Sequence, residues 1–254
     1  LELITLTHSM PEPNAVVLRT PLGNIFHTGD WKFDPDPVIG EASDQVTLKA
    51  LGDEGVLAAI GDSTNVFVEG VSGSEAALLD RLTTVIGRCN GKVAVACFAS
   101  NVARLKTIFQ AASANGRAVA LVGRSLWRIN AAARETGYLT DLPEFLEPEK
   151  MAAMDDSEIL YICTGSQGEP RAALTRIAAD DHRSVKLGEG DTVIFSSRII
   201  PGNELAIGRL HNSLIRQGAD VISENDEDIH VSGHPARGEL TEMNQLVRPQ
   251  ILIP

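Results

Sequence analysis

The sequence predicts an α/β protein built around a parallel β-sheet flanked by helices. Between about residues 72 and 226, short apolar runs alternate with segments whose apolar residues recur every three or four positions. The apolar runs lack polar alternation, as is typical of strands buried on both faces. Short links between them favour repeated β-α-β connections within one sheet. Residues 1–71 and 227–254 lack this regular alternation of strands and helices, so we expect them to form another domain.

The first of these flanking regions is rich in expected strands. Alternating apolar residues mark most of them, and Pro21–Asn24 has the composition of a hairpin turn. The acidic, glycine-dotted stretch 41–55 predicts a loop or a short helix. The expected strands are Leu3–Thr7, Ala15–Thr20, Asn24–His27 and Val56–Ile60.

The central region predicts five strands and five helices. Ser100 stands where a helix N-cap is expected. The strands are Lys92–Cys97, Ala118–Val122, Ile159–Cys163, Asp191–Phe195 and Ala219–Ile222, and the helices are 76–88, 100–114, 125–136, 171–179 and 203–217. In such sheets ligands gather at the carboxyl ends of the strands.

The last region predicts a short strand at Ile229–His234, a helix at Arg237–Val247 and a final strand at Ile251–Ile253. Leu1 and Pro254 both fall inside strand-like runs, so we expect the chain to be part of a longer protein.

Composition excludes several classes of protein. No apolar run approaches the roughly 20 residues that a membrane span requires. The three cysteines are odd in number and far apart, which favours reduced core thiols in a cytoplasmic protein over a disulfide framework or a zinc cluster. The net charge of −12 disfavours polyanion binding over the whole surface. A nucleic-acid partner would need a local basic channel.

Histidines and aspartates at strand ends are candidate metal ligands. His8 follows the first apolar run, and Asp30 follows another through Gly29. Imidazole and carboxylate groups suit a divalent cation. Each residue alone also fits an ordinary turn or surface position. His230 and His234 would point to the same side of an extended segment, where they could serve one cavity or form a hydrogen-bonded buried pair.

Polar loops after several central strands are candidate phosphate-binding sites. Backbone N–H groups, hydroxyls and arginines that follow a strand and precede a helix can bind phosphate oxygens. Ordinary N-capping by serine is the favoured explanation of each loop when it is taken alone. The Asp62 carboxylate, likewise, also fits a common Asx turn. The candidate residues of these loops are Ser100, Asn101, Arg104, Ser166, Gln167, Ser197 and Arg198.

In chain order, these motifs resemble those of the ribonuclease J family, in the β-CASP branch of the metallo-β-lactamase superfamily. His27–Asp34 (HTGDWKFD) and Thr7–Glu12 (THSMPE) resemble two of its metal motifs. Gly61–Asn65 (GDSTN) is similar to its acidic β-CASP motif, and His230–His234 (HVSGH) to its histidine motif. Two loops resemble those of the inserted domain, namely Thr164–Pro170 and Ser196–Glu204.

The resemblance implies roles for these residues. His8 would bind one metal ion and Asp30 would bridge two, zinc being expected and manganese the alternative. His234 would handle a proton and Asp62 would orient it. Ser232, Gly233 and His234 would hold a 5′-monophosphate or the scissile phosphate, and the loops at 100–104, 166–167 and 197–198 would line an RNA channel.

The same resemblance implies a fold and an activity. Residues 1–71 and 227–254 would be part of a metallo-β-lactamase αββα domain, interrupted by a β-CASP domain at 72–226. The whole enzyme would cleave single-stranded RNA in the cytoplasm, as an endonuclease and a 5′→3′ exonuclease acting in rRNA processing and mRNA decay, and would form dimers or tetramers. The family's H-x-H-x-D-H loop is absent here, so residues 1–254 alone should be inactive. A non-catalytic RNA-binding module and a related phosphodiesterase or DNA nuclease are the alternatives.

Overall fold

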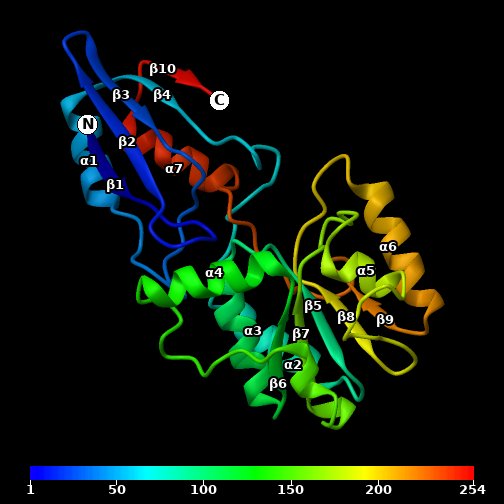
Figure 1. The fold of residues 1–254 in the computed structure, drawn as a ribbon. Helices are drawn as coiled ribbons and strands as arrows, with labels where there is room; N and C mark the ends of the chain where they lie inside the picture. The colour runs from blue at the N-terminus through cyan, green and yellow to red at the C-terminus, as the bar shows by residue number, and fades with distance from the viewer. The chain divides into compact units, whose positions relative to one another are not determined.

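The computed structural model describes all 254 residues and divides into two compact units (Figure 1). The first unit is Leu1–Ala76 together with Val231–Pro254, and the second is Ala77–His230. The borders expected from sequence fall at 71/72 and 226/227, a few residues before these divisions. None of the helices is long and apolar enough to cross a lipid bilayer.

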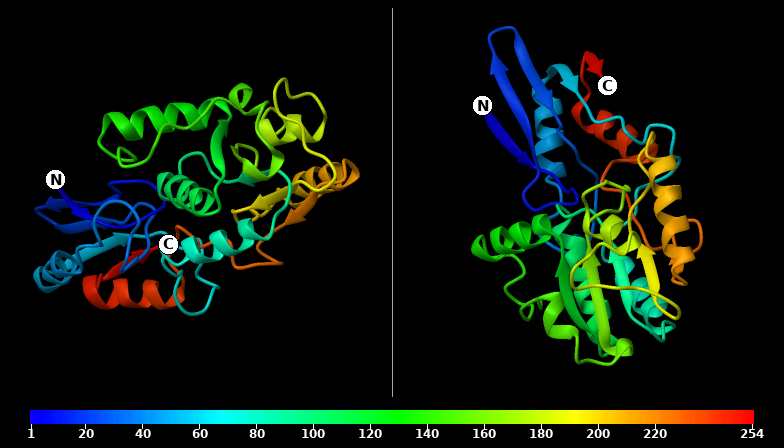
Figure 2. Two further views of the ribbon diagram at one scale, coloured as in Figure 1. Left: turned by 90° about the horizontal axis from the view of Figure 1, so that it is seen from below. Right: turned by 45° about the vertical axis from the view of Figure 1, so that its right-hand side comes forward.

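The first unit contains a five-stranded mixed sheet in the order β1-β2-β3-β4-β10. β1 to β3 are antiparallel neighbours, whereas β3, β4 and β10 run parallel. Its helices α1 and α7 pack side by side on one face of the sheet (Figure 2, left). The elements are β1 (Glu2–Thr5), β2 (Asn14–Thr20), β3 (Gly23–His27), α1 (Gln45–Glu54), β4 (Val56–Ile60), α7 (Arg237–Val247) and β10 (Ile251–Ile253).

One face of this sheet supplies the core of the first unit. Phe26, Val17 and Ala59 lie on it and pack with α1 and α7 residues such as Leu48 and Met243. Neighbouring strand positions point to the opposite face because side chains alternate along a strand. That opposite face is largely open: Leu3, Leu18, Ile251 and Ile253 are all exposed.

The second unit contains a five-stranded parallel sheet in the order β6-β7-β5-β8-β9. Every residue of β5, β7 and β8 is buried, so both faces of the sheet are covered. The elements are α2 (Leu78–Gly87), β5 (Val93–Ala96), α3 (Val102–Ala114), β6 (Ala118–Val122), α4 (Arg124–Glu135), two 3-10 turns (Pro148–Met151 and Asp156–Glu158), β7 (Ile159–Cys163), α5 (Ala173–Ala178), β8 (Thr192–Phe195), α6 (Glu204–Arg216) and β9 (Asp220–Ile222). The expected α/β class with a helix-flanked parallel sheet is confirmed.

Two local expectations are wrong. The residue that caps α3 is Asn101 and not Ser100, since the Asn101 side chain accepts a hydrogen bond from the Arg104 N–H. Residues 229–234 do not form a strand, although their composition suggested one. Local hydrogen bonds replace strand pairing there, because the Ser232 hydroxyl accepts the His234 N–H at 3.0 Å.

Candidate metal centre and phosphate-binding loops

A short antiparallel bridge brings the His8 and Asp30 segments together. Thr7 pairs with Lys32 outside the regular strands. The Lys32 N–H donates to the Thr7 carbonyl at 2.8 Å, and the Thr7 hydroxyl donates to the Lys32 carbonyl at 2.6 Å. β3 ends at His27, and Gly29 then takes a φ of +61°, a conformation that favours glycine. Asp30 is thereby presented beside His8.

A buried ion pair holds the segment that follows Asp30. The Lys32 ammonium lies 3.0 Å from the Asp34 carboxylate, and both side chains are 2% exposed. The same carboxylate accepts the Glu75 N–H at 2.9 Å. Burial by itself raises the pKa of Asp34, but the hydrogen bonds from Glu75 and Ser74, together with Lys32, outweigh it and hold this pKa below its ordinary value.

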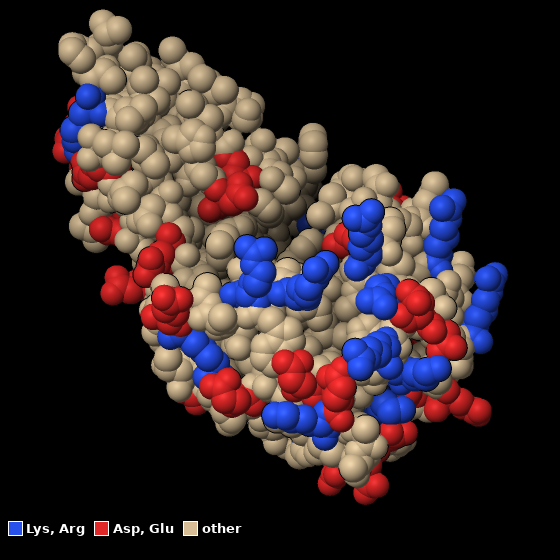
Figure 3. Space-filling view, in the orientation of Figure 1, with Lys and Arg blue, Asp and Glu red and all other residues tan.

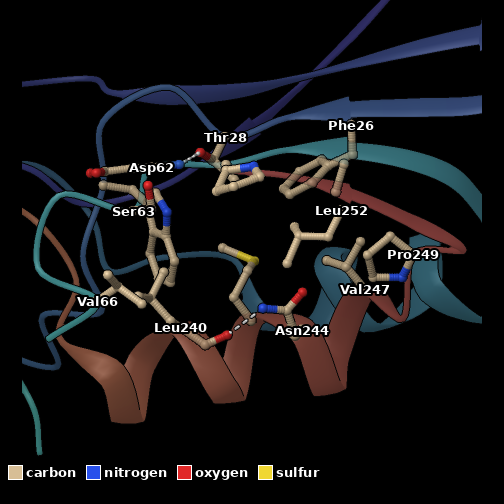
Figure 4. A pocket seen from close by; sticks show the side chains of 15 residues that line it. Phe26, Thr28, Asp62, Ser63, Val66, Leu240, Asn244, Val247, Pro249 and Leu252 are labelled. Carbon is tan, nitrogen blue, oxygen red and sulfur yellow. Dashed lines mark hydrogen bonds between the residues drawn. The ribbon is translucent and has the colours of Figure 1, made fainter. Parts of the chain in front are cut away.

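Asp62 stands at the end of β4 and pairs with His234. Its N–H donates to the Thr28 hydroxyl at 3.0 Å (Figure 4), which ties the loop to the end of β3. One carboxylate oxygen accepts the Thr64 N–H, and the other lies 2.6 Å from the His234 Nδ1. The hydrogen bond to Asp62 raises the pKa of His234. Burial favours a higher pKa for Asp62, but its bonds to His234 and Thr64 lower it.

The loop at 232–234 is fixed by its contacts with the start of the chain and with Asn65. The Asn65 amide donates to the Ser232 hydroxyl at 2.8 Å and to the His234 carbonyl at 3.1 Å. The Gly233 carbonyl lies 2.7 Å from the His8 Nδ1. A Cβ at Gly233 would come within 2.7 Å of the His8 ring, so only glycine fits without a shift. The motif Gly61–Asn65 gives no sign in the sequence of this role for Asn65.

His8, Asp30 and His234 form a cluster suited to a metal ion. One ligand atom from each lies within 4.8 Å of the others, and the two imidazole rings are 5.2 Å apart between centroids. Because each Nδ1 has a hydrogen-bond partner, the Nε2 of each ring is the atom left for a cation. Burial lowers the pKa of His8, which favours the neutral imidazole that metals bind. The donor set therefore fits a divalent cation.

The structure thus brings together four side chains that the sequence singled out: His8, Asp30, Asp62 and His234. His234, expected to handle a proton, is also placed as a donor atom of the cluster. His230 lies in the second unit and has a different neighbour, since its Nδ1 is 3.4 Å from the Arg104 guanidinium.

In the second unit, Arg104 lies inside the protein. Its side chain is 0% exposed and donates to the carbonyl and the hydroxyl of Ser196 at 2.7 and 2.8 Å. Arg104 therefore links the start of α3 to the end of β8. A direct contact between Arg104 and RNA stays a prediction. Ser196, which accepts both of these Arg104 hydrogen bonds, was not among the candidate residues of the sequence.

Gln167 joins the two other candidate loops. Its amide nitrogen donates to the Arg198 carbonyl at 2.9 Å. Its amide oxygen accepts the Ile200 N–H at 3.0 Å and the Asn203 amide at 3.2 Å. Ser166 and Ser197 beside these bonds are buried. The loops after β7 and β8 therefore form one hydrogen-bonded unit, as their common position at one sheet edge allows.

Comparison with known proteins decides the family. The family model "Ribonuclease J, beta-CASP domain" matches residues 90–214. The chain is 46% identical over all 254 residues to ribonuclease J of Sinorhizobium meliloti and covers 45% of that protein. It is 40% identical to ribonuclease J of Thermus thermophilus, of which it covers 44%. This chain belongs to the ribonuclease J family.

Membership confirms the expected fold class, including the β-CASP domain within a fold related to the metallo-β-lactamases. A crystal structure of an Enterococcus faecalis protein of unknown function has a similar fold, with a TM-score of 0.64 and 16% identity over the whole chain and 57% of that protein. The chain spans about half the length of the ribonuclease J proteins it matches.

Proposed function

We propose that this chain is part of a two-metal ribonuclease that hydrolyses single-stranded RNA in the cytoplasm. The carrying observation is the convergence of His8, Asp30 and His234 within 4.8 Å, with Asp62 bonded to His234. These side chains come from four separate segments, and such a convergence of imidazole and carboxylate groups is typical of hydrolytic metal centres.

The protein groups have distinct tasks in this proposal. His8, through Nε2, and Asp30 would hold the metal ions, zinc being preferred and manganese the alternative. The cations, when bound, activate water and neutralise charge on the phosphate oxygens. His234 carries a proton at Nε2, and Asp62 fixes the tautomer and orientation of its ring through Nδ1. The Ser232 hydroxyl and the neighbouring backbone orient a 5′-monophosphate or the scissile phosphate.

The activity is assigned to the longer protein. A two-metal centre needs more donors than His8 and Asp30 provide, because the His234 Nε2 carries the proton in this proposal. Residues 1–254 alone therefore should not cleave RNA. The longer protein should act both as an endonuclease and as a 5′→3′ exonuclease, prefer a 5′-monophosphate end, serve rRNA processing and mRNA decay, and assemble as a dimer or tetramer.

The test is cleavage of 5′-monophosphorylated single-stranded RNA by the full-length protein. Asp30→Ala should abolish turnover, with at least a thousandfold loss, while RNA binding remains. Asp36→Asn, which changes an exposed carboxylate on the same segment, is the matched control and should leave turnover unchanged.

Several outcomes would contradict the proposal. If the protein were a non-catalytic RNA-binding module, the unchanged full-length protein would bind the RNA without cleaving it. A DNA nuclease would cleave single-stranded DNA as readily as RNA. Metal-dependent cleavage by residues 1–254 alone would show that the proposed ligand set is wrong.

A further inference from the structure

The largest cavity among those described in the second unit lies at the carboxyl ends of β6 and β7. Its volume is about 950 Å³, within the range of small-molecule sites. The end of β6, the first turn of α4, the turn at Pro148 and the segment from Thr164 to Arg176 line it. Neither the metal cluster nor the Ser100 and Ser197 loops belong to this lining.

Arginines dominate the polar lining. Arg124 and Arg128 are one helical turn apart on α4, and Arg171 precedes α5. All three are exposed and have no hydrogen bond or ion pair within the protein. Figure 3 shows several Lys and Arg side chains on this side of the second unit, with Asp and Glu side chains among them. Cations without internal partners leave their donors available to a ligand.

The lining also contains acidic groups. Glu169 accepts the Gln167 N–H at 3.0 Å, and Glu149 is hydrogen-bonded by the Ser184 hydroxyl. Glu147 is the third carboxylate of the lining. Arg176 is paired with Asp181. Neutral donors do not remove the charge of Glu149 or Glu169, so the lining is distinguished by three guanidinium groups whose N–H donors have no partner in the protein, and not by a net positive charge.

Helix α4 adds backbone donors to the same cavity. Gly123 is its N-cap, with a φ of +139°, and provides no side chain to cap the first N–H groups. A Cβ there would come within 2.6 Å of Thr164, so the close approach of β6 to the Thr164 loop requires glycine. The 12-residue helix thus points its positive end at the cavity beside Arg124.

An aromatic side chain completes the lining. The Trp127 indole lines the cavity, and its Nε1 donates to the Leu121 carbonyl at 3.1 Å. This bond fixes the orientation of the ring. An indole beside guanidinium groups provides a surface for a nucleobase next to donors for phosphate.

We propose that this cavity binds nucleotide phosphates, with the guanidinium groups of Arg124, Arg128 and Arg171 and the start of α4 as donors and Trp127 beside the base. The shared chemistry is a phosphate attached to a nucleoside. It can come from a strand of RNA or from a free mononucleotide, and the test separates these two sources. The site is independent of the proposed metal centre, so Asp30→Ala should leave binding unchanged.

The test uses residues 1–254 carrying Trp31→Phe, which leaves Trp127 as the one tryptophan. Quenching of its fluorescence is followed during titration with hexauridylate, uridine monophosphate or inorganic phosphate. We expect quenching by hexauridylate, and Arg124→Gln with Arg128→Gln should weaken binding at least tenfold. The same pair should reduce the slope of log affinity against log salt by about 1.4 for a single strand. Arg209→Gln with Arg216→Gln, which removes two exposed arginines from α6, is the matched control and should change affinity less than twofold.

Comparing the probes shows whether the bound phosphate belongs to an RNA strand or to a free mononucleotide. Competition by uridine monophosphate at comparable concentration assigns the cavity to a mononucleotide, whereas binding that requires hexauridylate assigns it to an RNA strand. Equal weakening by the α4 and α6 pairs would overturn the proposal, because it would show general charge attraction. Absence of quenching by both nucleotide probes, with native circular dichroism, would also overturn it.

Discussion

The two units of this protein are stabilised in different ways. In the second unit the central strands are buried on both faces, and one apolar cluster runs from β6 to α6. In the first unit the sheet has one covered face, and its chemistry-bearing loops are held by hydrogen bonds between segments up to 225 residues apart. Apolar burial thus dominates one unit, and specific polar contacts order the other.

The contrast is sharpest at the buried charges of the first unit. Lys32 and Asp34 form an ion pair with both side chains 2% exposed. Glu239, 1% exposed, accepts from the Phe33 and Ala236 N–H groups at 3.0 and 2.8 Å. Because such groups are costly to bury without partners, they impose one arrangement on the loops around His8, Asp30 and His234. Hydrogen bonds and ion pairs therefore position the candidate metal site more than core packing does.

The largest expected effect on stability comes from breaking the ion pair between Lys32 and Asp34. Asp34→Asn leaves the Lys32 ammonium buried without a carboxylate and should lower the free energy of unfolding of the first unit by about 4 kcal/mol. The measurement is urea unfolding followed by Trp31 fluorescence in a Trp127→Phe background. Asp36→Asn, at an exposed neighbour, should change it by less than about 0.5 kcal/mol. Adding Lys32→Met should recover part of the loss, because it removes the unpaired charge.

The same pair gives the first unit an acid dependence. The pKa of Asp34 is lower in the folded protein than its ordinary value of 3.8. Its stabilisation is therefore fully present above that value and is lost as the pH falls through the lower, folded pKa. The stability difference between the unchanged protein and Asp34→Asn should stay constant above about pH 5 and shrink on acidification. A difference that grows with acid would refute the assignment.

The second unit should instead respond most to loss of apolar volume. Leu214, fully buried in the core on α6, is replaced by alanine, which should lower the free energy of unfolding of this unit by about 3 kcal/mol. Trp127 fluorescence in a Trp31→Phe background reports it. Leu205 on the same helix is 77% exposed, so Leu205→Ala should be nearly silent. An equal loss in both variants would argue against a core-dominated unit.

Most of the second unit was predictable because its strands are continuous apolar runs. Ala118–Val122 and Ile159–Cys163 form strands with the bounds that the sequence predicts. The remaining strands begin and end within one residue of expectation. Apolar periodicity reflects burial, and burial dominates this unit.

From the residues alone the site was predictable only as separate motifs, and the pairing of Asp62 with His234 was expected only from the family resemblance. His8, Asp30, Asp62 and His234 could be named from the sequence, but no periodic pattern encodes the contact between Asp62 and His234. Such contacts depend on the Thr7–Lys32 bridge and on Asn65, which are single long-range pairings. The arginine cavity was missed for the same reason, because Arg124 and Arg171 are distant in the chain and meet only through the order of β6 and β7.

The smallest expected effect comes from removing the N-cap of α3, a polar contact within the second unit that resembles those ordering the first. Asn101 accepts the Arg104 N–H at 2.8 Å and is 6% exposed. Asn101→Ala should lower the free energy of unfolding of the second unit by about 1 kcal/mol, the usual contribution of an N-cap. Ser100→Ala is the matched control, and urea unfolding followed by Trp127 fluorescence should detect little change, since Ser100 is exposed and its side chain does not cap α3. A larger loss for Ser100→Ala than for Asn101→Ala would restore the capping role that the sequence suggested and would narrow the contrast between the two units.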